Sequence, residues 1–134
     1  MECASWFIHK YILHGWLWKI HETHHRNSKS FFELNDLVSL FFATSSIVLI
    51  IYGLRDKDFK LWMGAGIAFY GILYFILHDI FIHKRIKFFK RIDNKYIQAI
   101  SRAHRTHHKH LSKNPSESFG LLWVNKKFFD PDKE

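Results

Sequence analysis

Two long stretches without a charged residue dominate the pattern of hydrophobic and polar positions. They cover residues 37–54 and 61–77, and the segment between them, RDKDFK, is mostly charged. Neither stretch shows a polar face at helical spacing, which disfavours the alternative of two buried helices in a soluble protein. At ~1.5 Å per residue each helix would be roughly 26 Å long, near the thickness of a bilayer's hydrocarbon core. The pattern therefore predicts a transmembrane hairpin.

The basic residues are distributed unevenly around this hairpin. The 134-residue chain has 20 Lys and Arg against 12 Asp and Glu, a formal net charge of +8. Only Arg55, Lys57 and Lys60 belong to the connector, and the other seventeen lie outside the hairpin. Because cytoplasmic loops carry the excess of basic residues, both ends of the hairpin are predicted to face the cytoplasm. This topology accounts for the basicity, and we expect no nucleic-acid partner.

Ten of the eleven histidines fall into groups that flank the hairpin. A hairpin returns the chain to the membrane face that it left, so groups distant in sequence meet at that face. Imidazole is a common ligand of transition metals, and ten such ligands suit two ions rather than one. The expected ligands are His9, His14, His21, His24, His25, His78, His83, His104, His107 and His108, and His110 lies outside this set.

The spacing of these histidines sets conditions on their helices. HETHH and HRTHH share the pattern H-x-x-H-H, which places three imidazoles on one helical face and would let them bind one ion. His14 precedes His21 by seven residues and would share its face on a continuous helix. His9 and His14 are five residues apart, as are His78 and His83, and five steps turn an ideal α-helix by about 140°. Each of these pairs needs a bulge or bend to point both rings inward.

HETHH also contains H-E-x-x-H, the zinc metalloprotease signature, with Glu22 as general base. HRTHH repeats the histidines with Arg105 in the place of that glutamate, so the repeated element does not include it. A protease would also leave most of the histidines without a role. Soluble di-iron bundles need two E-x-x-H units, of which only Glu22–His25 is present. An intramembrane metalloprotease is thus the alternative of a different class, and a non-catalytic metal store is a third.

Four segments resemble β-carotene hydroxylases of the bacterial type, members of the fatty acid hydroxylase and sterol desaturase superfamily. They are HKYILHGWLWKIHETHH, FELND, LYFILHDIFIHKR and RAHRTHHKH with the later SFGLL, in order along nearly the whole chain. The resemblance implies a membrane non-haem di-iron monooxygenase that uses O2 to hydroxylate the ionone rings of β-carotene, giving cryptoxanthin and then zeaxanthin. The family's histidine ligands match all ten expected positions. A fatty acid or sterol hydroxylase of the same superfamily is the nearest alternative, and zinc could replace iron in a structure.

Histidine ligands need hydrogen-bond partners on their second ring nitrogen, which fix the tautomer and the ring orientation. Asp79, Glu22 and Asn35 are the expected partners. Each of the last two has an alternative: Asn35, or Asp36 beside it, could cap the helix that begins near Leu37, and Glu22 could be a solvated surface charge.

The implied reaction also defines other partners. No flavin or nicotinamide motif is present, so electrons are expected from a separate donor such as ferredoxin and its reductase. The basic face could dock that donor or hold anionic lipid. The substrate, β-carotene or a ketolated carotenoid, would be dissolved in the bilayer. Small residues on both spans favour close helix packing, with a carotenoid groove as the alternative; they are Ser39, Ala43, Ser46, Gly64, Ala68 and Gly71.

These features together predict one all-α membrane-bound domain over residues 1–134. It would be an integral membrane helical bundle in the inner membrane, with a transmembrane hairpin and a histidine-rich di-metal cap on the cytoplasmic side. A first span near residues 1–18 is expected to be truncated, because Met1–Ile8 is mostly apolar but reaches only about 12 Å. Cys3 is the single cysteine, which excludes an internal disulfide and a cysteine zinc site.

Overall fold

The computed structural model describes residues 1–26, 31–86, 93–111 and 117–130. Within these ranges the chain forms helices and no strand, so the all-α prediction is confirmed there. The π-helices are labelled η1 and η2, and η3 is a 3-10 helix. In chain order the elements are α1 (Glu2–Phe7), η1 (Ile8–Trp16), α2 (Trp18–His25), α3 (Asp36–Asp56), α4 (Lys60–Tyr74), η2 (Phe75–Ile82), α5 (Lys95–His108) and η3 (Lys126–Phe129).

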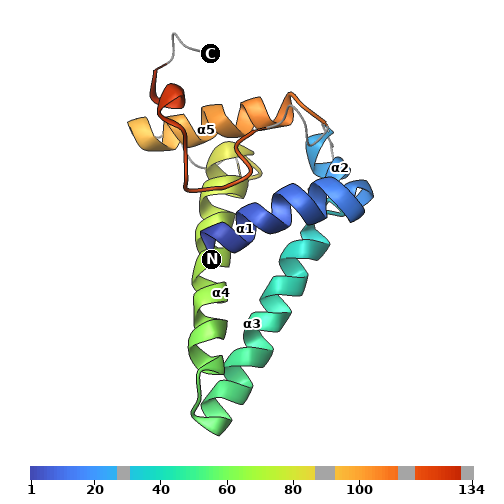
Figure 1. Ribbon diagram of the computed structural model, residues 1–134, viewed down its shortest axis with the longest axis vertical. Helices are drawn as coiled ribbons and strands as arrows, with labels where there is room; N and C mark the ends of the chain where they lie inside the picture. The colour runs from blue at the N-terminus through green and yellow to red at the C-terminus, as the bar shows by residue number, and fades with distance from the viewer. Residues whose placement is uncertain (27–30, 87–92, 112–116, 131–134) are drawn as a thin grey trace.

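The two longest helical stretches, α3 and α4 with its continuation η2, form the hairpin that dominates Figure 1. Asp36–Asp56 has 21 residues and Lys60–Ile82 has 23, and both are long and apolar enough to cross a membrane. Only 11% of the most apolar 18 residues of each is buried within the protein. Their apolar side chains therefore face outward, unlike those of core helices in a soluble protein. The second helix extends beyond the predicted end at residue 77 and includes His78.

Small residues bring α3 and α4 together in the half of the hairpin near the connector. Ser46 Oγ donates a hydrogen bond of 2.8 Å to Gly64 O, and a Cβ added at Gly64 would lie 2.8 Å from Ser46 O. A Cβ added at Gly53 would lie 2.0 Å from Leu61 N, so no larger residue fits there. Gly71, in contrast, has nothing within 4 Å of such a Cβ. The expected close packing is found at Ser46 and Gly64 but does not extend to Gly71.

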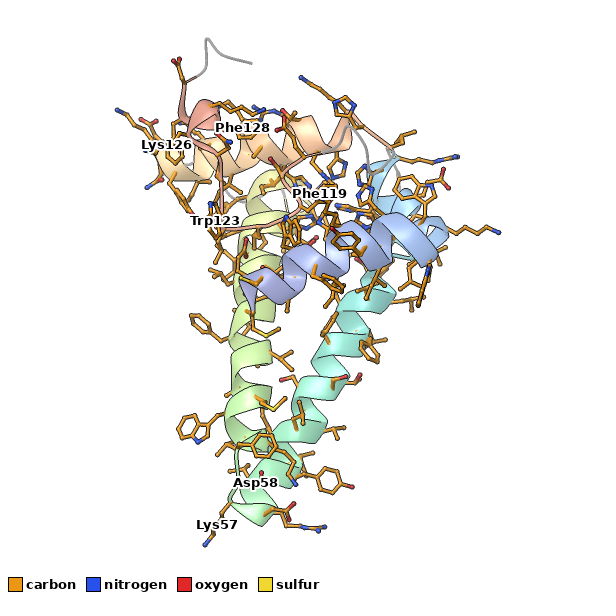
Figure 2. All side chains as sticks on the ribbon, viewed as in Figure 1. Lys57, Asp58, Phe119, Trp123, Lys126 and Phe128 are labelled. Carbon is orange, nitrogen blue, oxygen red and sulfur yellow. The ribbon has the colours of Figure 1, made fainter. Side chains whose placement is uncertain are left out.

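The other helices form a cap at the end of the hairpin opposite the connector (Figure 1). Figure 2 shows Lys57 and Asp58 at the tip of the hairpin and Phe119 among the side chains of the cap. In the cap, α5 begins at the N-cap residue Asn94, whose side chain accepts hydrogen bonds from Tyr96 N and Ile97 N. The buried face of α5 carries Ala99, Ile100, Ala103, His104 and His107. This amphipathic helix thereby turns its histidines inward.

The carboxylate of Glu2 joins three parts of the fold. Its Oε2 accepts a hydrogen bond of 2.6 Å from the Tyr70 hydroxyl on α4. Its Oε1 accepts from Leu122 N at 2.8 Å and from Trp123 N at 3.1 Å. The N-terminal helix α1 is thus connected both to the hairpin and to the segment that precedes η3.

Candidate metal centre

Both histidine pairs with five-residue spacing lie in π-helices. A π-helix closes its turns with i→i+5 hydrogen bonds, seen here from Leu17 N to Ile12 O and from His83 N to His78 O, each 2.9 Å. Residues five apart then face nearly the same way. The ring centroids are 5.2 Å apart for His9 and His14 and 4.6 Å apart for His78 and His83. The local bulge that the spacing required is therefore present in both helices.

The chain bends between His14 and His21. Gly15 has non-helical dihedral angles, φ −123° and ψ −109°, so η1 does not continue straight into α2. The condition under which His14 and His21 would share a face, one continuous helix, is therefore not met at Gly15. The bend nevertheless leaves the two imidazole centroids 4.9 Å apart.

Nine histidines form two groups in which one ligand nitrogen from each ring lies within 4.8 Å of all the others. His78 lies beside the second group, with its ring centroid 4.7 Å from those of His24 and His104. Cluster A consists of His9, His14, His21, His25 and His107, and cluster B consists of His24, His83, His104 and His108. All ten predicted positions are thus brought together in the cap.

The two H-x-x-H-H segments each contribute to both clusters. On α2 the i and i+4 residues, His21 and His25, belong to cluster A, while His24 belongs to cluster B. On α5 the assignment is reversed, because the i+3 residue His107 belongs to cluster A and the other two histidines belong to cluster B. The three imidazoles of each segment are therefore divided between the two clusters. The i and i+4 rings project toward one cluster and the i+3 ring toward its neighbour.

Neutral oxygen acceptors orient three imidazoles of cluster A. The Nδ1 atoms of His9 and His107 donate to the backbone carbonyls of Phe119 and Glu117 at 2.8 and 2.9 Å. The Nδ1 atom of His21 donates to Asn35 Oδ1 at 2.9 Å. Because a carbonyl oxygen can only accept, Nδ1 carries the proton and the Nε2 lone pair points into the cluster.

These lone pairs meet in a way that fits a metal ion. The Nε2 atoms of His9 and His21 lie 2.9 Å apart, and both rings already hold their proton on Nδ1. Two facing lone pairs repel unless a cation binds both. Imidazole nitrogens lie ~2.1 Å from a transition metal, so two of them at right angles around one ion are about 3 Å apart. The Nε2 atoms of His14 and His107, 3.1 Å apart, have a similar separation.

Carboxylates orient two imidazoles at cluster B. The Nδ1 atom of His24 donates to Glu33 Oε2 at 3.0 Å, and that of His78 faces Asp79 Oδ1 at 3.3 Å. The Nε2 atoms of His24, His78 and His108 are buried and have no hydrogen-bond partner among the described residues. An unpaired polar atom is costly to bury, and a bound metal ion would satisfy all three nitrogens. The donor set of this cluster also fits a transition metal.

Burial keeps the imidazoles neutral, which is the form that binds metal. It lowers the pKa of His21, His83 and His107 to about 4 and that of His108 to about 3, because a charged ring loses its hydration in the cap. At neutral pH each of these rings is therefore uncharged and has one unprotonated nitrogen that can bind a metal ion.

The three predicted hydrogen-bond partners are placed differently. Asn35 contacts His21 and makes no side-chain cap bond to α3, although it is the N-cap residue. Asp79 faces His78 as expected. Glu22 instead forms an ion pair of 2.6 Å with Arg26 on the surface of α2, because its position in the helix points away from the clusters. Within the described ranges Glu22 is therefore a surface charge, the alternative interpretation of this residue.

Glu33 and Arg85 are functional candidates that sequence reasoning missed. The Arg85 guanidinium contacts Asp36 at 2.8 Å, Glu33 at 3.0 Å and Asp79 at 3.4 Å. Burial raises the pKa of Glu33, and the charge of Arg85 opposes that shift. A signal was available for both: Glu33 lies within FELND, and Arg85 follows His83 by two residues. The backbone carbonyls at Glu117 and Phe119 had no comparable signal.

The comparison with known families agrees with this geometry. The family model for fatty acid hydroxylase matches residues 1–129. The chain belongs to the fatty acid hydroxylase family. Members of this family to which it is similar include the beta-carotene hydroxylase of Pseudescherichia vulneris, 40% identical over 94% of this chain and 72% of the relative. That of Pantoea ananas is 42% identical over 92% of this chain and 71% of the relative.

Relatives of this hydroxylase extend to plants. The chloroplastic beta-carotene 3-hydroxylase 1 of Arabidopsis thaliana is 34% identical over 81% of this chain, which corresponds to 36% of that longer protein. No solved structure matches the chain. The resemblance drawn from the histidine motifs is thus confirmed, and the chain is a hydroxylase by family.

Proposed function

We propose that the chain is a membrane-bound β-carotene 3-hydroxylase whose histidine clusters hold two iron ions. It would hydroxylate the ionone rings of β-carotene to give cryptoxanthin and then zeaxanthin. The observation that carries the proposal is the convergence of unprotonated Nε2 atoms on two adjacent points, in a chain similar to beta-carotene hydroxylases over more than nine-tenths of its length.

The residues of clusters A and B would hold the ions, with His78 completing cluster B. Iron bound there would activate O2 for insertion of one oxygen atom into a C–H bond of the substrate. The surrounding residues orient the rings and exclude water. Phe119 is 4% exposed and sets its ring edge-on against His9, His14 and His107. This apolar cover supports oxidative chemistry away from bulk solvent.

The hairpin would anchor the enzyme as a membrane helical bundle. The excess of basic residues outside the connector supports a cytoplasmic position of the cap at the inner membrane. Outward-facing side chains near the cap, such as Leu40, Phe41 and Phe75, provide an apolar surface along which a carotenoid could approach from the bilayer. Electrons would come from a separate donor such as ferredoxin with its reductase, docked on the basic face of the cap.

Expression of the chain in cells that accumulate β-carotene tests this function. We expect cryptoxanthin and zeaxanthin in the extracted pigments, and none when His107→Ala replaces the unmodified chain. Hydroxylated fatty acids or sterols without hydroxylated carotenoids would favour the alternative substrates of the superfamily. Cleaved membrane peptides would favour the metalloprotease. Unchanged β-carotene beside membrane-inserted, iron-loaded protein would overturn the proposal.

A further inference from the structure

We propose that the two metal sites are chemically inequivalent, because Glu33 and Asp79, held by Arg85, give cluster B an anionic support that the described residues do not give cluster A. Glu33 is assigned as a positioning residue that acts on the metal through His24. This inference rests on the proposed function only in requiring that both clusters bind metal.

The acceptors behind cluster A are uncharged. Two are backbone carbonyls, those of Glu117 and Phe119, and the third is the side-chain amide oxygen of Asn35. Such acceptors fix the ring and its tautomer but place no formal charge next to the imidazole.

The acceptors behind cluster B are carboxylates. Glu33 Oε2 lies 3.0 Å from His24 Nδ1, and Asp79 Oδ1 lies 3.3 Å from His78 Nδ1. The side chains of His24 and His78 are 1% and 3% exposed, so solvent screens these contacts little. A hydrogen bond to a carboxylate is about twice as strong as one to a neutral oxygen, and it raises the basicity of the ligand. His24 and His78 are therefore more strongly polarised donors than the imidazoles that donate to neutral oxygens.

Arg85 makes this support rigid. Its Nη2 donates to the same Glu33 oxygen that faces His24, and its Nε lies 3.4 Å from the Asp79 oxygen that faces His78. Its Nη1 donates to Asp36 at 2.8 Å, and Asp36 Oδ2 in turn accepts from Glu33 N at 3.0 Å. One guanidinium thus joins the segment before α3 to the end of the second long helix. Both carboxylates are held in place behind one cluster.

The test measures zinc affinity one cluster at a time in the full chain, purified in detergent. His9→Ala removes a ligand of cluster A, so that cluster B is titrated as the tighter site, while His83→Ala does the reverse. Zinc is titrated against a chromophoric chelator, and bound zinc is counted by mass spectrometry. Glu33→Gln is then added to each background, because glutamine keeps one hydrogen-bond acceptor and nearly the same shape while it removes the charge.

We expect Glu33→Gln to weaken zinc binding by roughly 10–100-fold in the His9→Ala background and to leave it unchanged in the His83→Ala background. Asp79→Asn, a second variant of nearly identical shape, should show the same selectivity. Asn35→Ala should instead weaken zinc binding in the His83→Ala background, because Asn35 orients His21 of cluster A. Glu22→Gln makes the same chemical change in an exposed ion pair and should alter neither affinity.

If Glu33→Gln lowers zinc affinity equally in both backgrounds, or in neither, the proposed inequivalence is overturned. An unmodified chain that binds fewer than two zinc ions would overturn both this inference and the metal centre of the proposed function. Selective loss of zinc in a chain that forms no hydroxylated carotenoid would uphold the inequivalence and contradict only the proposed substrate.

Discussion

His25 and His108 stack their imidazole rings with a centroid separation of 4.3 Å and an interplanar angle of 14°. One ring belongs to cluster A and the other to cluster B. The two clusters are therefore in direct contact through this stacked pair and form a single centre. The two rings come from α2 and α5, which the hairpin separates in sequence. Disturbing either helix is therefore expected to affect both clusters.

Replacing a clustered histidine should lower activity far more than replacing His110. His107→Ala removes a fully buried ring of cluster A. The resulting loss of activity should exceed the roughly 10–100-fold loss that follows removal of a ligand's hydrogen-bond partner. His110→Ala should retain most activity and both metals. Carotenoid analysis and metal counting on matched membrane preparations would check this. A dead His110→Ala protein with full metal content would contradict the assignment of this histidine.

Glu22→Gln separates a hydroxylase from a protease. The ion pair of Glu22 with Arg26 is solvent-exposed, so its loss should change stability by less than about 1 kcal/mol. We expect the variant to bind two metals and to hydroxylate β-carotene at a rate close to that of the unmodified chain. A protease would lose its general base and become inactive. Loss of hydroxylation with both metals retained would count against the hydroxylase interpretation of this residue.

Glu2 should matter for cluster A although it touches no histidine. Its bonds to Leu122 N and Trp123 N hold the segment whose Phe119 carbonyl orients His9. Glu2→Ala would remove these hydrogen bonds, each of which contributes about 0.5–1.5 kcal/mol. Thermal unfolding should show this loss of stability, and zinc titration should show weaker binding at cluster A. Tyr70→Phe removes only one of the bonds and should have a smaller effect.

Glycines on α4 should differ in their tolerance of a larger side chain. Gly64→Val would place its Cβ atom against the backbone of α3, and such overpacking typically costs about 1–3 kcal/mol. Gly71→Val meets open space at the same helix and serves as the matched control. Melting temperatures in detergent would compare them. Equal destabilisation by the two variants would show that helix propensity, and not contact with α3, determines the effect.

Acid should destabilise the metal-free protein. Burial lowers the pKa of His21, His83 and His107 to about 4, whereas histidine in an unfolded chain titrates near 6.5. Between these values the unfolded chain binds more protons, so the free energy of unfolding falls as the pH falls. Melting temperatures at pH 7 and pH 5 should show the decline. Added zinc should shift the fall in melting temperature to lower pH, because protons and zinc compete for the same nitrogens. A melting temperature independent of pH would contradict the buried, neutral state of these rings.

The sequence predicted the hairpin and the gathering of ten histidines, because both follow from local patterns. Charge-free runs identify the long helices, and a hairpin returns its flanks to one end. The division of each H-x-x-H-H segment between two clusters depends on how α2 and α5 pack, which spacing alone does not encode. The ion pair between Glu33 and Arg85 spans 52 positions in the chain. The acceptors for His9 and His107 are main-chain carbonyls. Every residue has a main-chain carbonyl, so the sequence does not indicate which ones serve as acceptors.

The π-helices η1 and η2 give the metal centre an unusual sensitivity to residue count. In each, the wider turn accommodates one residue more than an α-helical turn between the paired histidines. Removing one residue between His78 and His83 would allow ordinary i→i+4 bonding and leave the two rings at i and i+4, which an α-helix places on one face. Adding one residue would separate them by six positions and rotate the helix after the insertion by about 100° relative to the helix before it. Substitutions at the intervening positions would preserve this register. Sequence drift along these turns, or the loss of one codon, is thus compatible with the pairing of the two rings, whereas a codon gained is not.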